Sequence, residues 1–198
     1  MTLDADQCFN GVFTQASESS IRQAVGMSAR TLVLLRHAKA EAPGELPDFE
    51  RRLTTAGESD ADAAGAWLAD QRLHPDLVFC SPAARTRQTW QGVSIALAQA
   101  RPGGGAPEVR YDKGLYTGGR TEVFDLLRSV PEQVRTVLVV GHNPTVSDVS
   151  LLLMPDDQVD GEPVGLKTSG LAVHRTDTPW AHTGPGSMRL IGRHTARG

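Results

Sequence analysis

Two arginines and two histidines stand where apolar segments of this 198-residue chain end. They are Arg36, His37, Arg85 and His142. Guanidinium groups bind phosphoryl oxygens through paired hydrogen bonds, and a neutral imidazole can attack phosphorus and carry the group as a covalent intermediate. A carboxylate-binding pocket would also use arginines, but the two histidines argue for chemistry beyond binding. Together these residue types predict phosphoryl transfer, which depends mainly on positioning and charge stabilisation.

Three apolar segments must bring these side chains together. They are residues 31–35 (TLVLL), 76–80 (DLVFC) and 136–140 (TVLVV), and each has the pattern of a buried strand. The carboxyl ends of parallel strands meet at one edge of a sheet, and helices that begin there add backbone N–H groups. We therefore expect an anion pocket at that edge. Ser81-Pro82 is typical of a helix start, with Ser81 as the N-cap.

Helical and strand patterns alternate along the rest of the chain. Helices are predicted over residues 56–71, 82–100, 119–129 and 144–154, and further strands over 108–112, 171–175 and 188–192. This alternation predicts an α/β three-layer sandwich with a mostly parallel central sheet and helices on both faces. His174, His182 and His194 are expected at the surface or at a strand edge.

The length suits a single domain. Residues 1–26 show no sustained periodicity and are expected to form a flexible N-terminal extension, with a short packed helix as the alternative. Residues 27–198 form the predicted domain. The acidic stretch after Met154 is expected to be a mobile loop.

The composition argues against several classes of partner. The net charge is −3, which is unlike the basic surface of a nucleic-acid-binding protein. Nucleic acid is therefore not expected as a partner. No apolar run reaches the roughly 18 residues of a membrane-spanning helix, so no membrane is expected as a partner either. Cys8 and Cys80 do not make a disulfide framework, which favours a cytoplasmic location.

Three motifs resemble those of the histidine phosphatase superfamily. Residues 35–38 (LRHA) resemble its RHG motif with Ala38 in place of the usual glycine, 81–90 (SPAARTRQTW) resemble its S-P-x-x-R-x-x-Q-T element, and 139–147 (VVGHNPTVS) resemble its second histidine motif. Residues 48–57 (DFERRLTTAG) resemble the D-x-x-R-P-L-T-x-x-G segment of the SixA-type phosphohistidine phosphatases, with Arg52 in place of the proline. Residues 166–175 (LKTSGLAVHR) resemble that branch as well.

The resemblance implies a phosphoglycerate mutase-like fold and a role for each site residue. His37 would be the nucleophile that becomes phosphorylated, Arg36 and Arg85 would bind the phosphoryl oxygens, and His142 would hydrogen-bond the phosphoryl group in the transition state. No cofactor is expected. The histidines are scattered away from cysteines, so no metal site is expected either.

A dedicated acid is missing from the sequence pattern. Mutase-like members of the superfamily carry a glutamate after the third strand, whereas Glu122 falls inside the next predicted helix here. Glu41 and Asp48 remain candidate proton donors on a loop. Because imidazole leaves far more easily than an alkoxide, a phosphohistidine substrate needs less help from an acid.

The preferred hypothesis is therefore a phosphatase acting on phosphohistidine in a protein, with a monomer as the working expectation. One alternative is a small-molecule phosphomonoesterase or mutase on the same fold, which an acid entering the pocket from residues 41–50 would favour. The partner would then be a small phosphate ester rather than a phosphorylated protein. An alternative of another class is a non-catalytic phospho-ligand binding module.

Overall fold

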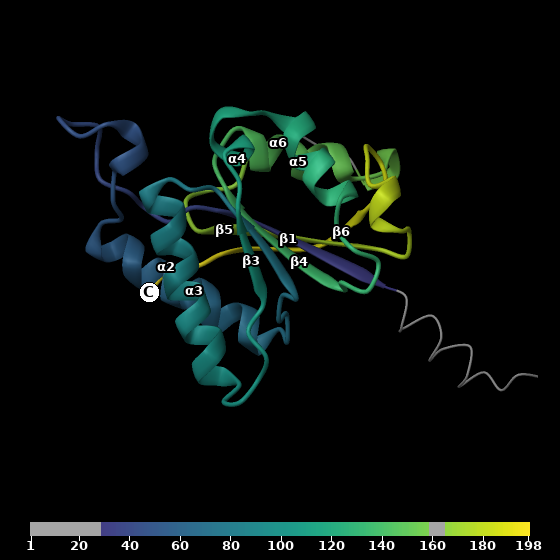
Figure 1. Ribbon diagram of the computed structural model, residues 1–198, viewed down its shortest axis with the longest axis horizontal. Helices are drawn as coiled ribbons and strands as arrows, with labels where there is room; N and C mark the ends of the chain where they lie inside the picture. Colours follow the sequence, from purple (N-terminus) through teal and green to yellow (C-terminus); the bar gives the residue numbers. More distant parts are fainter. Residues whose placement is uncertain (1–28, 159–164) are drawn as a thin grey trace, which may run out of the picture.

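A six-stranded sheet runs through the centre of the molecule in the order β3-β2-β4-β1-β5-β6 (Figure 1). The computed structural model describes residues 29–158 and 165–198. The strands are β1 (Arg30–Arg36), β2 (Leu77–Cys80), β3 (Glu108–Tyr111), β4 (Thr136–Gly141), β5 (Gly170–Thr176) and β6 (Arg189–Thr195). The extension predicted over residues 1–26 lies outside the described residues, as do residues 159–164 of the acidic stretch.

The direction of the strands confirms a mostly parallel sheet. β1, β4, β2 and β3 pair with one another in parallel, and β5 runs antiparallel to both of its neighbours, β1 and β6. Five of the six strands therefore point the same way. The strands that precede the predicted site residues occupy the middle of the sheet.

Helices cover both faces of the sheet (Figure 1). α2 (Thr55–Asp70) and α3 (Ala84–Ala100) pack against each other on one face, whereas α4 (Gly114–Thr117), α5 (Arg120–Arg128) and α6 (Thr145–Leu153) lie on the other. Short 3-10 turns occur at η1 (Asp48–Glu50), η2 (Asp156–Gln158) and η3 (Trp180–His182). The predicted α/β three-layer sandwich is confirmed, and α4 is an addition to the predicted helices. Within the described ranges, no helix has the length and apolar character needed to cross a membrane.

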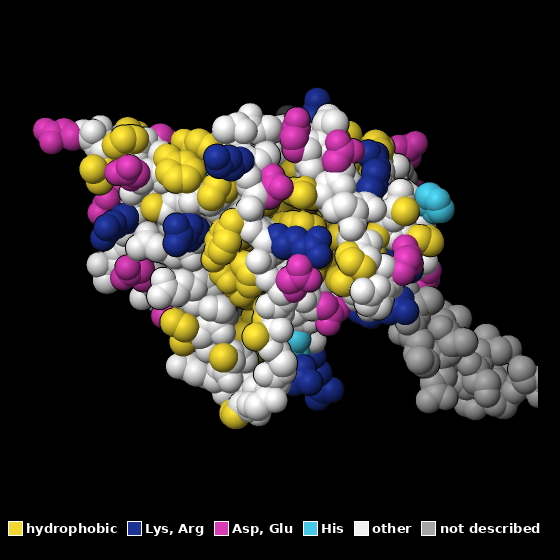
Figure 2. Space-filling model, in the orientation of Figure 1, with side chains coloured by type: hydrophobic (Ala, Val, Ile, Leu, Met, Phe, Trp, Pro, Cys, Tyr) yellow, Lys and Arg dark blue, Asp and Glu magenta, His cyan; other side chains and the backbone are white. Residues whose placement is uncertain are grey.

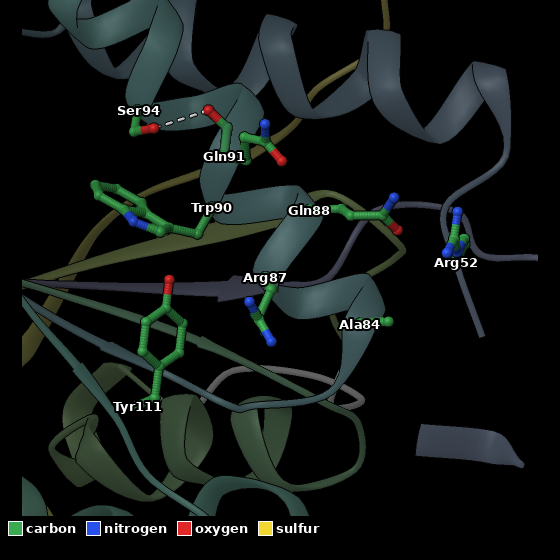
Figure 3. Close-up of a pocket in the computed structure, with 8 residues that line it drawn as sticks. All are labelled: Arg52, Ala84, Arg87, Gln88, Trp90, Gln91, Ser94 and Tyr111. Atoms are coloured by element: carbon green, nitrogen blue, oxygen red, sulfur yellow. Dashed lines mark hydrogen bonds between the residues drawn. The ribbon is translucent and has the colours of Figure 1, made fainter. Parts of the chain in front are cut away.

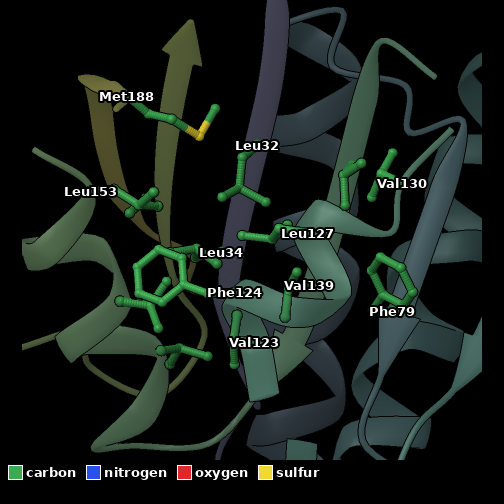
Figure 4. Packing of buried hydrophobic residues seen from close by; sticks show 14 of the residues in the cluster. Leu32, Leu34, Phe79, Val123, Phe124, Leu127, Val130, Val139, Leu153 and Met188 are labelled. Carbon is green, nitrogen blue, oxygen red and sulfur yellow. The ribbon is translucent and has the colours of Figure 1, made fainter. Parts of the chain in front are cut away.

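Alternate residues of each central strand enter different cores. Leu32 and Leu34 of β1 pack in the cluster beneath α5 and α6, where Figure 4 shows Phe124 beside them. Val33 and Leu35 face the opposite cluster, beneath α2 and α3. Because successive side chains of a strand point to opposite faces, a strand covered on both sides must be apolar throughout. This explains the uninterrupted apolar pattern of residues 31–35. Packing on both faces holds the end of β1 rigidly in place.

The start of α3 differs from the prediction. The helix begins at Ala84 with Ala83 as its N-cap, and Ser81 lies fully buried two residues earlier. The Thr86 hydroxyl is 2.7 Å from the carbonyl oxygen of Ser81 and 2.8 Å from that of Ala83, so it bonds the backbone around the helix start. The prediction of Ser81 as an N-cap was wrong, and its side chain serves a different contact.

The three late histidines lie in different environments. His182 is exposed, and His194 of β6 stacks on Trp67 with ring centroids 4.7 Å apart. His174 was predicted at the surface or at a strand edge but is completely buried, with Nε2 2.9 Å from the Ser150 hydroxyl oxygen. The physical reason is that β5 lies between β1 and β6, so α6 covers its inner face.

We expect His174 to make the fold less stable in acid. Burial lowers its pKa from 6.5 to about 4 in the folded protein, so the unfolded chain takes up the proton first. The contribution of the neutral ring is complete above about pH 6.5 and falls by about 3 kcal/mol as the pH drops to 4. His174→Gln keeps a polar group near Ser150 without titrating in this range. Its free energy of unfolding in urea should therefore fall less between pH 7 and pH 4 than that of the wild type, and equal losses would contradict the expectation.

Candidate active site

The carboxyl ends of the central parallel strands lie side by side. Arg36 ends β1 and pairs with Gly141 at the end of β4. Two backbone hydrogen bonds of 3.0 Å continue the pairing, from His37 N to Gly141 O and from Ser81 N to Val140 O. The residues that follow the strands are thus fixed against one another. The four predicted site residues come together here: Arg36, His37, Arg85 and His142.

His37 is held as a neutral imidazole with one nitrogen available. Its Nδ1 lies 2.8 Å from the carbonyl oxygen of Ala38. Since a carbonyl oxygen can only accept a hydrogen bond, Nδ1 carries the proton and Nε2 keeps its lone pair. Burial lowers the pKa of His37 to about 4, and the charges of Arg85 and Arg36 lower it further against the bond to Ala38. At neutral pH this ring is uncharged, and its free lone pair could act as a nucleophile.

His142 lies beside His37 and is fixed by Ser81. The two imidazole centroids are 5.1 Å apart, and His142 Nε2 lies 2.8 Å from the Ser81 hydroxyl oxygen. Burial lowers the pKa of His142 to about 3, helped by His37 and Arg85. Its Nδ1 is buried without a hydrogen-bond partner among the described residues. A neutral ring with an unused nitrogen can form one further hydrogen bond in this pocket.

Arg36 is anchored to the segment that precedes β5. Its Nη1 donates to the carbonyl oxygen of Leu166 at 2.9 Å, and the Asn143 side-chain amide donates to the same oxygen at 2.8 Å. Burial lowers the pKa of Arg36, but a guanidinium remains charged at any ordinary pH. Its remaining N–H groups supply fixed positive charge beside the two rings.

Side chains from α3 hold the segments around the site. The Thr89 hydroxyl accepts from Ala38 N at 3.0 Å and donates to Arg85 O at 2.7 Å. The Gln88 side-chain oxygen accepts from Leu53 N at 2.8 Å. Thr89 and Gln88 therefore act near the pocket through packing and hydrogen bonding. They tie the loop after β1 and residue 53 to a single rigid helix.

Arg85 is nearly buried and bonds Asp48. Only 6% of Arg85 is exposed, and its Nη2 lies 2.9 Å from Asp48 Oδ2 while Nη1 donates to Asp48 O at 2.6 Å. Arg51 Nη1 lies 2.7 Å from Asp48 Oδ1, and the Tyr116 hydroxyl donates to Oδ2 at 3.0 Å. An acid from residues 41–50 therefore does reach the site. Asp48 occupies N–H groups of Arg85 that a phosphoryl group would need.

Asp48 is ionised at neutral pH. The hydrogen bond from Arg51 lowers the pKa of Asp48 to about 2, and the contacts with Tyr116 and Arg85 act in the same direction. The other candidate acids lie elsewhere. Glu41 is exposed and its carbonyl oxygen accepts from Arg51, while Glu122 accepts from Gly119 N at the start of α5. Among the described residues, none of these three carboxylates is both at the site and protonated.

Metal chemistry has no obvious ligand set in the described residues. Residues 29–158 and 165–198 contain no group of three or more His, Cys, Asp or Glu side chains arranged to hold a metal ion. The site is instead built from two guanidinium groups, two neutral imidazoles and a serine.

Known proteins share this fold and much of this sequence. The model of the histidine phosphatase superfamily (branch 1) matches residues 32–111. A candidate phosphohistidine phosphatase SixA from Nakamurella multipartitia is 34% identical, with a TM-score of 0.74 over 85% of this chain and 96% of that structure. A second candidate SixA, from Agrobacterium tumefaciens, is 32% identical with a TM-score of 0.66, over 83% and 97% of the two chains. An uncharacterized protein of Mycobacterium tuberculosis is 36% identical over 82% of this chain and its own full length.

The chain belongs to the histidine phosphatase superfamily. The two similar structures place it in the SixA-type branch, as the motifs predicted, with the phosphoglycerate mutase-like fold. It is a phosphatase, and phosphatases of this superfamily work through a histidine intermediate.

Three features of the phosphatase site depend on contacts that the sequence pattern did not indicate. Ser81 bonds His142 rather than capping a helix, and Asp48 is ionised rather than a proton donor. Tyr116 of α4 packs 5.6 Å from His142 between ring centroids, and its ring lies 5.9 Å from the Arg85 guanidinium carbon. The position of Ser81 directly after an apolar strand was the available signal. Tyr116 had none, because α4 itself was not predicted.

We expect Asp48→Asn to bind inorganic phosphate more tightly. Removing the carboxylate charge removes a competitor for Arg85 while the side chain keeps its size. A gain of about tenfold corresponds to roughly 1.4 kcal/mol, which is within the range of one charged contact. Titration calorimetry at pH 7.5 measures it. Asp125→Asn, which removes an exposed carboxylate paired with Arg128, is the matched control and should leave the Kd unchanged. An unchanged Kd for Asp48→Asn would show that its carboxylate does not compete with phosphate.

Proposed function

We propose that this phosphatase hydrolyses phosphohistidine in a protein through a phosphorylated His37. The observation that carries the proposal is the ionised state of Asp48, the carboxylate that contacts the site, whose pKa is about 2. Cleavage of an alkyl phosphate needs a proton donor for the alkoxide, whereas imidazole leaves readily. A site rich in guanidinium groups and lacking a protonated acid suits the second kind of substrate.

The residues divide the reaction between them in two steps. His37 Nε2 attacks phosphorus, a new P–N bond forms, and the P–N bond to the substrate ring breaks. The substrate ring, protonated on its other nitrogen, leaves as neutral imidazole. Water then attacks phosphorus and gives up a proton to solvent, the bond to His37 breaks, and inorganic phosphate leaves with His37 restored as the neutral ring. Arg36 and Arg85 bind the equatorial oxygens, and His142 donates a hydrogen bond to the phosphoryl group. Arg85 must exchange Asp48 for phosphoryl oxygens before the first step.

The similar structures support this substrate class. The proteins from Nakamurella multipartitia and Agrobacterium tumefaciens are both described as candidate phosphohistidine phosphatases, and both exceed 30% identity.

We also propose that residues 27–198 form the catalytic domain and that the enzyme acts in the cytoplasm, where the buried free thiol of Cys80 would stay reduced.

A small phosphate ester is the second candidate substrate. The specific observation in its favour is that Asp48 reaches the site from residues 41–50. Its low pKa opposes a role as general acid, because a group of that kind is already deprotonated at the pH of the reaction.

The deciding experiment compares a phosphohistidine protein with a panel of small phosphate esters, without added metal. Wild type should hydrolyse the phosphohistidine protein at least about a thousandfold faster than His37→Ala. The enzyme should also acquire an acid-labile phosphoryl group on His37, detectable by mass spectrometry of a rapidly quenched reaction. His194→Ala, which removes a ring stacked on Trp67, is the control and should retain activity.

The outcomes separate the candidate functions. Faster turnover of a small ester, still lost in His37→Ala, would overturn the substrate assignment and keep the mechanism. Equal rates in wild type and His37→Ala would overturn the role of His37.

A further inference from the structure

A groove runs along the outer side of α3, next to the catalytic site. One cavity of about 450 Å³ is lined by Arg52, Ala84, Arg87, Gln88, Trp90, Gln91, Ser94 and Tyr111. A second cavity of about 250 Å³ shares Trp90 and Ser94 with the first and continues to Arg101. On the face that carries α3 and β3, the space-filling view shows a strip of hydrophobic side chains with Lys or Arg side chains on both sides (Figure 2).

The groove is basic although the whole chain is acidic. No Asp or Glu lines either cavity, while Arg52, Arg87 and Arg101 do. All three arginines are exposed, and none forms an ion pair with a described carboxylate. The net charge of the protein is −3, and Glu58 and Asp62 line an adjacent cavity that shares Gln88 and Gln91 with the first, so the positive charge is confined to the groove itself. It is complementary to a ligand that carries several carboxylates.

The groove offers fixed contacts for a polypeptide. The Arg87 guanidinium carbon lies 5.7 Å from the centre of the Tyr111 ring, which limits the motion of the side chain. Figure 3 shows Gln88 extending from α3 toward Arg52, and Arg87 lying between Arg52 and Tyr111 in this view. The side chains of Gln88 and Gln91 can pair with backbone N–H and C=O groups. At 1.5 Å per residue, the stretch of α3 from Arg87 to its last residue, Ala100, is roughly 20 Å long, the length of an extended segment of about six residues.

The groove is also tied to the catalytic site. Arg52 follows Arg51, which bonds Asp48, and Gln88 holds Leu53 N. Arg87 lies two residues after Arg85 on the same helix. Because residues two apart on a helix point to different sides, Arg87 faces away from the buried Arg85, and the groove approaches the catalytic site through Arg52 and Gln88. Arg52 moreover occupies the position at which the SixA-type motif has proline, so its charge is not required by that motif.

We propose that this groove binds an acidic segment of the phosphohistidine-bearing protein, with Arg52 and Arg87 pairing with its carboxylates. The proposal rests on the proposed function and adds the means by which the enzyme would select its protein substrate. Contacts away from the reacting centre hold the substrate so that its phosphohistidine enters the pocket between Arg36 and Arg85.

The first test measures binding apart from catalysis. A fluorescein-labelled peptide of alternating Glu and Ser is titrated with the full-length enzyme, and its anisotropy is compared with that of a Gln-Ser peptide. We expect the double variant Arg52→Glu, Arg87→Glu to bind the acidic peptide at least about tenfold more weakly, and added NaCl to weaken wild-type binding. Arg175→Glu is the matched control, because Arg175 is an exposed arginine of β5 at the opposite end of the sheet, paired with Thr31. Equal affinity of the wild type for the two peptides, or an unchanged affinity in the double variant, would overturn the proposal.

The second test measures selection of the substrate. The quantity is the ratio of kcat/KM for a phosphohistidine protein with an acidic surface to kcat/KM for free phosphohistidine. This ratio should fall at least about tenfold in the double variant, through KM, and should be unchanged in Arg175→Glu. A constant ratio would overturn the role of the groove. Failure of the wild type to hydrolyse either substrate would instead overturn the proposed function, and the peptide titration would still decide whether the groove binds acidic segments.

Discussion

The parallel pairing of β2, β4 and β1 is the constraint on which the rest of this molecule depends. Each strand is covered on both faces, so its residues are apolar and its position across the sheet is strongly specified. The pairing ends with Arg36 opposite Gly141, and the next backbone bonds run from His37 N and Ser81 N to β4. The polar side chains beyond these points are therefore placed by the core and not by their own attraction. Two guanidinium groups would otherwise repel each other.

Burial then sets the chemical state of these side chains. The imidazoles of His37 and His142 are removed from water beside two fixed positive charges, and both effects favour the neutral ring. The arginines stay charged because of their much higher intrinsic pKa. One environment thus yields a neutral ring with a free lone pair and fixed positive charge that suits an anion. A more exposed pocket would leave part of the imidazole population protonated in mildly acidic conditions and would weaken the attraction for the phosphoryl group.

The architecture and the convergence of two arginines and two histidines could be predicted because both follow from local patterns. Apolar runs identify the strands. The residues that follow each run lie at the carboxyl end of the sheet, whatever the order of the strands. The missed features depend on contacts between segments that are distant in the chain. Asp48 was a candidate acid, but its pKa is lowered first by Arg51 and then by contacts with Tyr116 and Arg85, which are 68 and 37 residues away. His174 was misplaced because only the strand order shows that β5 is an interior strand.

Arg85 connects the buried site to the surface. A guanidinium that is 6% exposed needs a partner, and Asp48, whose side chain is half exposed, supplies one. In the proposed reaction a phosphoryl group would replace the Asp48 carboxylate at Arg85, so Arg85 would stay compensated while the carboxylate returned toward water. Asp48 cannot gain a proton in this exchange while Arg51 remains bonded to it. Asp48 thus compensates Arg85 while its bond with Arg51 keeps it ionised, and the imidazole leaving group of the proposed reaction, which needs little protonation, suits a site of this kind.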